Sequence, residues 1–166
     1  IGRKHLIPQH FCKKKVTVED LQKLPNQFIL KTSNGSGTNI IVRNKKQEDL
    51  QQICDTINFF TKIKYGYIWG EFYYNKVPIR IVAEKLLEDE NGDIPNDLKI
   101  HCFNNGREKH KIIESYYKIE GQIYKNCYDE NWKPLNYVYG FTSDGRKIPR
   151  PKNLKEIIKI ADKLSE

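Results

Sequence analysis

Two runs of β-prone residues flank a short loop of small polar residues near the N-terminal end of the chain. Residues 27–31 and 39–43 are rich in apolar and β-branched side chains, whereas residues 32–38 are only Thr, Ser, Asn and Gly. β-Branched residues favour extended backbone, and Gly and Asn favour turns. The pattern therefore predicts a strand, a glycine loop and a second strand, so the chain has to build a β-sheet.

Helical signals accompany this sheet. Apolar residues recur at steps of three or four in residues 46–63 and again in residues 151–164. This is the period of an amphipathic helix that packs one face against a sheet. A shorter helix is expected before Pro25, because Thr17 begins a Thr-Val-Glu-Asp sequence with the character of a helix N-cap.

Further strands are expected in the second half of the chain. Apolar and β-branched runs indicate them, and an Asn-Asn-Gly turn signal separates two of them. These strands are residues 77–87, 99–103, 111–117 and 121–128. The aromatic-rich residues 63–74 are interpreted as loop and short strand. Strand signals therefore occupy much of the chain between the helical stretches.

The composition is that of a folded globular protein with a basic surface. Of 166 residues, 38% are hydrophobic and 30% charged, which suffices to bury a core without disulfides. Lys and Arg number 29 against 21 Asp and Glu, a net charge of +8. This excess attracts phosphates, nucleic acids or anionic glycans, although solvated lysines on helix faces explain it as well.

Cysteine spacing and hydropathy indicate a cytoplasmic protein. The four cysteines form no Cys-x-x-Cys pair, so reduced thiols are a simpler interpretation than a zinc knuckle or redox motif. No run of 18 apolar residues predicts a membrane span, and the N-terminal end has no apolar signal core. Because the sequence begins with Ile1 rather than Met, we expect a shortened or internal fragment of a longer protein.

The glycine loop has the composition of a phosphate-binding loop. Backbone N–H groups of Ser, Gly, Asn and Thr can approach a phosphate chain without side-chain bulk, and Lys31 at the end of the preceding strand adds a cation. An ordinary hairpin turn has the same composition. The loop matches neither a Walker P-loop nor a GxGxxG motif, so on its own it leaves both interpretations open.

Two later segments suit other parts of a nucleotide. Residues 83–89 run from a strand into an acidic linker, where backbone groups could pair an adenine edge and a carboxylate could hold ribose hydroxyls. Asp97 and Lys99 enter another strand, from which Lys99 could contact phosphates. Acidic turns and local ion pairs explain either segment equally well. The order of the three features favours nucleotide binding more than any one of them.

That order resembles the ATP-grasp superfamily, and more closely its TupA-like branch from bacterial capsule, teichuronic acid and O-antigen biosynthesis. The segments that carry the resemblance extend over nearly the whole chain. They are residues 24–37, 81–89, 97–104, 128–132 and 148–154. The resemblance implies an α+β, ATP-grasp-like fold with antiparallel β-sheets and packed helices. ATP would lie between an N-terminal lobe, residues 1–76, and a second lobe, residues 77–166.

The resemblance also implies roles for individual residues. Lys31 and Lys99 look like the family's phosphate-contacting lysines, and residues 34–37 look like its mobile loop. Residues 84–87 resemble the hinge strand that pairs adenine through its backbone, and a carboxylate at 88 or 89 would face the ribose. The residues expected to bind the nucleotide are therefore Lys31, Asn34, Gly35, Ser36, Gly37, Glu84, Lys85, Leu87, Glu88, Asp89 and Lys99.

Magnesium ligands are expected outside this chain. In ATP-grasp enzymes they follow the helix that here ends near Glu166, so the fold is expected to be incomplete at the C-terminus. Asp129 and Asp144 do not sit in that motif, and we assign no metal ligand and no catalytic residue. ATP and Mg are the expected cofactors of the parent protein.

The superfamily usually activates a carboxylate as an acyl phosphate that a nucleophile then attacks. The expected parent is an ATP-dependent carboxylate ligase acting on a polysaccharide precursor or another carboxylate substrate. This segment alone is expected to bind the nucleotide without catalysis, because magnesium supplies a large part of the charge stabilisation.

Two other functions are compatible with the composition. A glycosyltransferase would also need a basic diphosphate pocket, but the chain has no DxD-type metal motif. A binding module for RNA or an anionic glycan could use the positive charge with aromatic stacking surfaces. These are Tyr65, Tyr67, Trp69, Tyr73, Tyr116 and Tyr117. Strand tyrosines more often pack than stack on ligands, so nucleic acid is not the expected partner.

Overall fold

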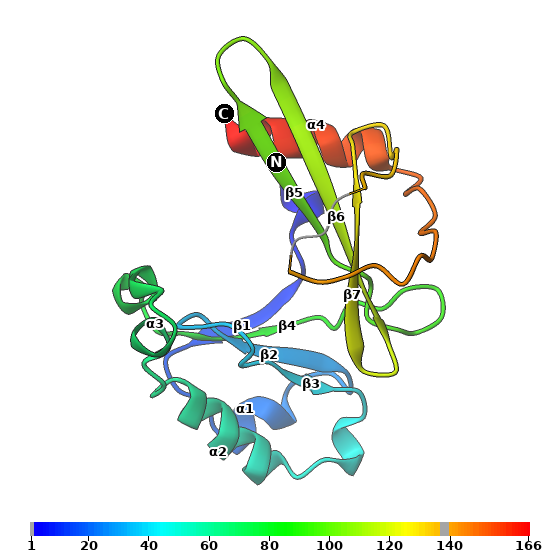
Figure 1. Ribbon diagram of the computed structural model, residues 1–166. Helices are drawn as coiled ribbons and strands as arrows, with labels where there is room; N and C mark the ends of the chain where they lie inside the picture. Colours follow the sequence, from blue (N-terminus) through cyan, green and yellow to red (C-terminus); the bar gives the residue numbers. More distant parts are fainter. Residues whose placement is uncertain (1, 137–139) are drawn as a thin grey trace. The chain divides into compact units, whose positions relative to one another are not determined.

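The computed structural model describes residues 2–136 and 140–166 and contains two antiparallel sheets (Figure 1). A four-stranded sheet lies in the unit Gly2–Glu88, and a three-stranded sheet lies in the unit Asp89–Glu166. Helices accompany both sheets, which confirms the predicted α+β class with antiparallel sheets and packed helices.

The sheet of the first unit is built from strands that are distant in the sequence. Its strands, β1 (Gln9–Lys13), β2 (Phe28–Thr32), β3 (Ile40–Val42) and β4 (Ile81–Glu84), have the spatial order β1-β4-β2-β3. The predicted hairpin of β2 and β3 is confirmed. Strand β1 was not expected, because its sequence shows no apolar alternation. In the structure its residues are mostly exposed. Strand β4 occupies the middle of the run predicted over residues 77–87.

The boundary between the two units differs from the predicted lobe boundary after residue 76. The first unit continues to Glu88, because β4 pairs with β1 on one side and with β2 on the other. These two ladders join β4, near the end of the first unit, to strands nearer its beginning. The division into lobes of residues 1–76 and 77–166 stays a prediction about how the nucleotide is held.

Helices cover one face of the first sheet. Helix α1 (Val18–Gln22) begins in a capping box, in which Thr17 accepts from the backbone N–H of Asp20, and α2 (Leu50–Phe60) begins at the N-cap Asp49. Short 3₁₀ turns η1 (Arg3–His5) and η2 (Lys45–Gln47) complete the connections. The predicted helices over residues 17–24 and 46–63 are thus confirmed, with shorter bounds.

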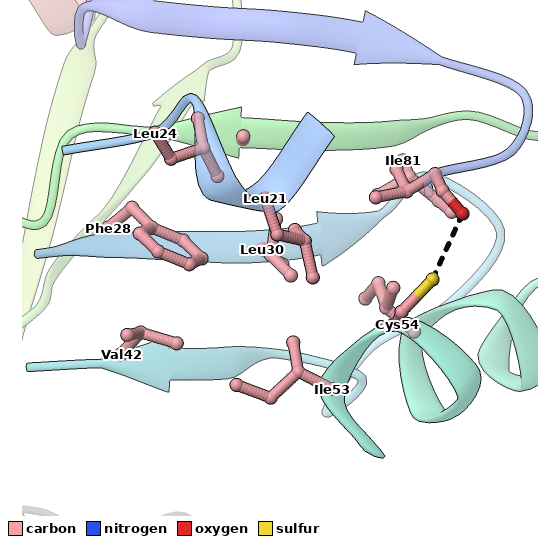
Figure 2. Close-up of a cluster of buried hydrophobic side chains, with 11 residues drawn as sticks. Leu21, Leu24, Phe28, Leu30, Val42, Ile53, Cys54 and Ile81 are labelled. Atoms are coloured by element: carbon pink, nitrogen blue, oxygen red, sulfur yellow. Dashed lines mark hydrogen bonds between the residues drawn. The ribbon is translucent and has the colours of Figure 1, made fainter. Parts of the chain in front are cut away.

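The first core lies between this face of the sheet and the helices (Figure 2). Alternate residues of β2 and β4 and the apolar faces of α1 and α2 fill it. Its fully buried members are Val16, Leu21, Phe28, Leu30, Val42, Ile57, Ile81 and Ala83. The Cys54 thiol donates to the carbonyl of Val16 at 3.1 Å, the dashed line in Figure 2, so this polar group at the edge of the core is paired.

The aromatic-rich segment after α2 is helical. It forms α3 (Tyr65–Ile68) and η3 (Phe72–Lys76), so the prediction of loop and short strand over residues 63–74 is wrong. Its two turns approach closely at Gly66, where a Cβ atom would stand 2.8 Å from the carbonyl of Glu71. The β-favouring aromatic composition is therefore overridden by packing that only a glycine allows.

The second unit has a smaller core on one face of its sheet. Strands β5 (Leu98–Asn104), β6 (Lys109–Ile119) and β7 (Gln122–Tyr128) lie in the order β5-β6-β7, and α4 (Leu154–Ser165) packs against β5. The strands and helix predicted here are confirmed. Ile113, Tyr128 and Leu154 are buried together, with Trp132 stacked on Tyr128 at 4.1 Å between ring centres.

An ion pair adds to this contact between helix and sheet. Lys111 of β6 is 7% exposed and lies 2.7 Å from Asp162 of α4. The longest helix, α4, has 12 residues, and no helix within residues 2–136 and 140–166 is long and apolar enough to cross a membrane.

Truncating a buried phenylalanine should destabilise the first unit far more than truncating an exposed one. Phe28 is fully buried, whereas Phe59 of α2 is 59% exposed. Phe28→Ala should lower the free energy of unfolding by about 3–5 kcal/mol, and Phe59→Ala by less than about 0.5 kcal/mol. Denaturant unfolding followed by far-UV circular dichroism measures both. Similar losses in the two variants would contradict the core described above.

Candidate functional site

The sheet of the first unit has a second face, opposite the helices. Along β2, Phe28, Leu30 and Thr32 point into the core, so Ile29 and Lys31 point the other way and are half-buried. The β2–β4 register places Ile29 beside Glu84 and Lys31 beside Val82. These residues, Ile29, Lys31, Val82 and Glu84, form what we call the open face. Helices α1 and α2 lie on the other side of the sheet (Figure 1).

An ion pair crosses the open face. The Lys31 ammonium lies 2.7 Å from the carboxylate of Glu84, and the two side chains are 36% and 20% exposed. Both residues were predicted to bind nucleotide, and the structure brings them together. A partly exposed pair of this kind contributes roughly 0–1 kcal/mol to stability. Because the contribution is small, an anionic ligand can compete with Glu84 for the lysine.

The glycine loop leaves β2 at the Lys31 end and has a fixed base. The hydroxyls of Thr32 and Thr38 lie 2.7 Å apart and are buried, which closes the loop. Ser33 donates to the carbonyl of Pro78 at 2.8 Å and accepts from the backbone N–H of Arg80 at 2.9 Å. The base is therefore attached to the chain just before β4.

Asn34 fastens the same loop to the end of α2. Its side-chain nitrogen donates to the carbonyls of Phe60 and Ile63 at 3.2 and 3.0 Å, and the residue is only 5% exposed. The next residue, Gly35, lies against the ring of Tyr65, where a Cβ would come within 2.8 Å. Among the predicted loop residues, Asn34 thus has a structural partner and Gly35 is needed for close packing.

The tip of the loop is available to a ligand. Ser36 and Gly37 are exposed, and Gly37 has a φ of 75°, a left-handed conformation that glycine adopts without strain. Within the described part of the chain, no hydrogen bond uses the backbone N–H of Gly35, Ser36 or Gly37. These donors can therefore turn to a phosphate chain without breaking an existing bond.

The predicted hinge begins at the other end of the β2–β4 ladder. From Thr32 beside Ile81 to Ile29 beside Glu84 the ladder advances three residues, roughly 10 Å. The backbone N–H of Lys85 donates to the carbonyl of Pro8 at 2.9 Å, so it already has a partner.

Leu87 of the hinge and the neighbouring Glu88 differ in their surroundings. The Leu87 side chain is 43% exposed. The carboxylate of Glu88 lies 2.8 Å from the guanidinium of Arg43.

Two predicted residues belong to the second unit. The Asp89 carboxylate accepts from the backbone N–H groups of Asn91 and Asp93 at 2.8 and 3.0 Å, so it shapes its own turn. The Lys99 ammonium lies 4.4 Å from the ring centre of Tyr116, a cation–π contact.

A buried charge network below Lys99 was missed by the sequence analysis. Glu114 and Lys125 face each other across β6 and β7 at 2.8 Å, with side chains only 4% and 1% exposed. The second oxygen of Glu114 accepts from the Tyr116 hydroxyl at 2.7 Å and lies 3.3 Å from Nε2 of His101. The partner of His101 lies 13 residues later in the sequence, and no local pattern indicates it.

The network changes the acidity of its carboxylate. Burial by itself raises the pKa of Glu114, but hydrogen bonds from Lys125, Tyr116 and His101 outweigh burial and lower the pKa from 4.5 to about 2. Glu114 is therefore ionised throughout the physiological range, and its charge is matched by the lysine beside it.

A family model described as TupA-like ATPgrasp matches residues 1–166. The chain belongs to the TupA-like ATP-grasp family. No curated protein and no solved structure matches it. The resemblance stated from the sequence motifs is thereby confirmed, and with it the presence of an ATP-grasp domain.

ATP-grasp proteins generally use ATP and magnesium, so the donor set of this TupA-like chain can be compared with the needs of a metal. Within residues 2–136 and 140–166, no group of three or more His, Cys, Asp or Glu side chains is arranged to hold a metal ion. Asp144 accepts from the Tyr117 hydroxyl at 2.6 Å, and Asp129 accepts from the backbone N–H of Lys133 at 2.7 Å. The described residues thus do not fit a magnesium centre, and we derive no step through one.

The Glu114 network should make the second unit of this ATP-grasp chain sensitive to acid. The folded pKa of about 2 lies below the unfolded value of 4.5, so the ionised carboxylate adds stability above pH 4.5 that is lost as the pH falls toward 2. Unfolding by urea at a series of pH values, followed by Trp132 fluorescence in a Trp69→Phe background, measures this loss. Glu114→Gln should flatten the profile across the same window.

The partner lysine provides the matched comparison. Lys125→Met leaves a buried carboxylate without its cation and should cost about 3–5 kcal/mol at pH 7, while the double variant Glu114→Gln/Lys125→Met should recover part of that loss. A pH profile that is unchanged by Glu114→Gln would show that other groups control acid unfolding.

Proposed function

We propose that this chain binds ATP on the open face of the first unit, as the nucleotide-binding part of an ATP-dependent carboxylate ligase in bacterial surface-polysaccharide biosynthesis. The observation that carries the proposal is the position of Lys31. It lies on the open face, next to a loop whose tip has backbone N–H donors that no hydrogen bond within the described residues uses, and it pairs with the partly exposed Glu84.

The loop end of the open face suits the phosphates. A triphosphate needs several donors and a compact cation, and the N–H groups of residues 35–37 with the Lys31 ammonium supply them. Phosphate oxygens would replace the Glu84 carboxylate as the partner of Lys31. The fixed base of the loop limits the ordering cost to the exposed tip.

The hinge end suits the base and the ribose. Ile29 and Val82 offer an apolar surface for one side of adenine, and the chain at Leu87 offers backbone groups for its edge. Since the N–H of Lys85 is bound to Pro8, we assign the donor role to Leu87 rather than to Lys85. Glu88 would hold the ribose hydroxyls, in competition with Arg43.

In the proposed reaction, the chain neutralises charge and positions the reacting groups. A substrate carboxylate oxygen attacks the γ-phosphorus, the bond to the ADP oxygen breaks, and an acyl phosphate forms; a nucleophile then displaces phosphate. Lys31 would stabilise the negative charge that the transferred phosphoryl group carries. Magnesium, where bound, would share this charge. The proposed substrate is a polysaccharide precursor or another carboxylate.

We also propose a cytoplasmic location, where ATP is available. None of the cysteines in the described residues is in a disulfide, which supports a reducing compartment.

Calorimetric titration with ATP tests the proposal. Lys31→Met should weaken binding about tenfold or more, equivalent to about 1.4 kcal/mol or more, because a cation at the phosphates is lost. Glu84→Gln should leave binding unchanged or tighten it, because the competing carboxylate is removed. The titrations are repeated with and without magnesium, and with UDP-sugars in place of ATP.

A charge-matched control separates local from general electrostatics. Lys23→Met removes one positive charge from the exposed end of α1, on the helix side of the first sheet, and should leave the ATP affinity unchanged. Absence of ATP binding, or tighter binding of a UDP-sugar, would overturn the proposal and favour a glycosyltransferase. An equal loss in both lysine variants would place the nucleotide elsewhere.

A further inference from the structure

The helical segment Tyr65–Lys76 presents an unusual group of large side chains to solvent. Each member is at least 60% exposed, although all five are aromatic or aliphatic. We call this group the aromatic platform: Tyr67, Ile68, Trp69, Phe72 and Tyr73. Single exposed apolar residues are common on proteins, but five on one short helical segment, with the rings of Tyr67 and Phe72 packed edge to face at 6.0 Å between ring centres, mark an interaction site.

The exposure of the platform is imposed by a rigid scaffold beneath it. Tyr65 and Tyr74 are turned inward and pack edge to face at 5.0 Å between ring centres. Gly66 is buried against Glu71 and Asn75, which allows α3 to approach η3, and Tyr65 in turn packs on Gly35. With these residues inside, their neighbours have to point outward. Figure 1 places α3 and its turn at one end of the first unit.

Exposed lysines flank the platform along the chain. Lys62 and Lys64 precede it and Lys76 ends it, and all three are exposed. Glu71 is the one acidic residue between positions 62 and 80, and it accepts from the Tyr73 hydroxyl at 3.0 Å. A partner of this surface therefore has to accept apolar and amphipathic rings at its centre and be anionic around them.

We propose that the aromatic platform binds the surface of an anionic lipid bilayer. Trp and Tyr favour the headgroup region, because their rings are apolar and their N–H or O–H groups remain hydrated there. Phe72 and Ile68 add apolar side chains for the acyl boundary, and the three lysines are attracted by acidic headgroups. The platform lies on two short helical turns, and the lysines that flank it outnumber the single Glu71, which suits an anionic planar surface.

This proposal is independent of ATP binding and is tested without nucleotide. In a Trp132→Phe variant, Trp69 is the remaining tryptophan and lies within the platform. Adding vesicles of phosphatidylcholine with phosphatidylserine should shift its emission to shorter wavelength, whereas phosphatidylcholine alone should produce little shift. High salt should weaken binding, because the lysine contribution is screened.

Variants identify the residues responsible, by co-sedimentation with the same anionic vesicles. Trp69→Ser/Phe72→Ser and, separately, Lys62→Gln/Lys64→Gln/Lys76→Gln should each lower the partition coefficient about tenfold or more. The matched controls are Phe103→Ser, an exposed aromatic residue of the second unit, and Lys152→Gln/Lys155→Gln/Lys159→Gln on and before α4. Both controls should bind like the unmodified protein.

Several results would overturn the proposal. No emission shift with anionic vesicles, or a platform variant that sediments like the unmodified protein, would show that the platform does not contact lipid. Self-association that is abolished by Trp69→Ser/Phe72→Ser would identify a second copy as the partner. Quenching of Trp69 by an RNA oligonucleotide, without vesicle binding, would identify a nucleic-acid surface.

Discussion

The insertion of β4 between β1 and β2 is the interaction on which the first unit depends. It joins residues 81–84 to strands that begin at Gln9 and Phe28, and so converts a local hairpin into a four-stranded sheet. One face of β4 supplies Ile81 and Ala83 to the core, and the other supplies Val82 and Glu84 to the open face. The same pairing therefore closes the core and assembles the candidate site.

Local sequence patterns predicted those elements that have an apolar run, a period or a turn signal of their own. The β2–β3 hairpin, the three strands of the second unit and the amphipathic helices have a period or a turn signal of their own. Strand β1 has neither, and it is a strand because β4 lies beside it. The aromatic segment folds as helix because of a contact at Gly66, which no local propensity describes.

The candidate site could be predicted in composition but not in geometry. Sequence reasoning named Lys31 and Glu84 separately, and their contact across 53 residues appears only in the folded sheet. Asn34 was named as part of the loop that resembles the family's mobile phosphate loop, yet its amide is used to bind the end of α2. A polar side chain can serve a ligand or the fold, and which of the two it serves depends on distant carbonyls and carboxylates that the local sequence does not reveal.

The two units hold their candidate lysines by different physical means. Lys31 stands on a sheet whose other face is a continuous apolar core, so its position follows from strand register. Lys99 rests on the ring of Tyr116, whose hydroxyl is fixed by the buried Glu114–Lys125 pair in a unit with few buried apolar residues. A buried ion pair adds little net stability compared with apolar side chains in the same place. Leaving one of its charges without a partner is costly, however, so the pair restricts the arrangement of the residues around it. The position of Lys99 therefore depends on charge matching beneath the sheet surface, whereas that of Lys31 depends on hydrophobic packing.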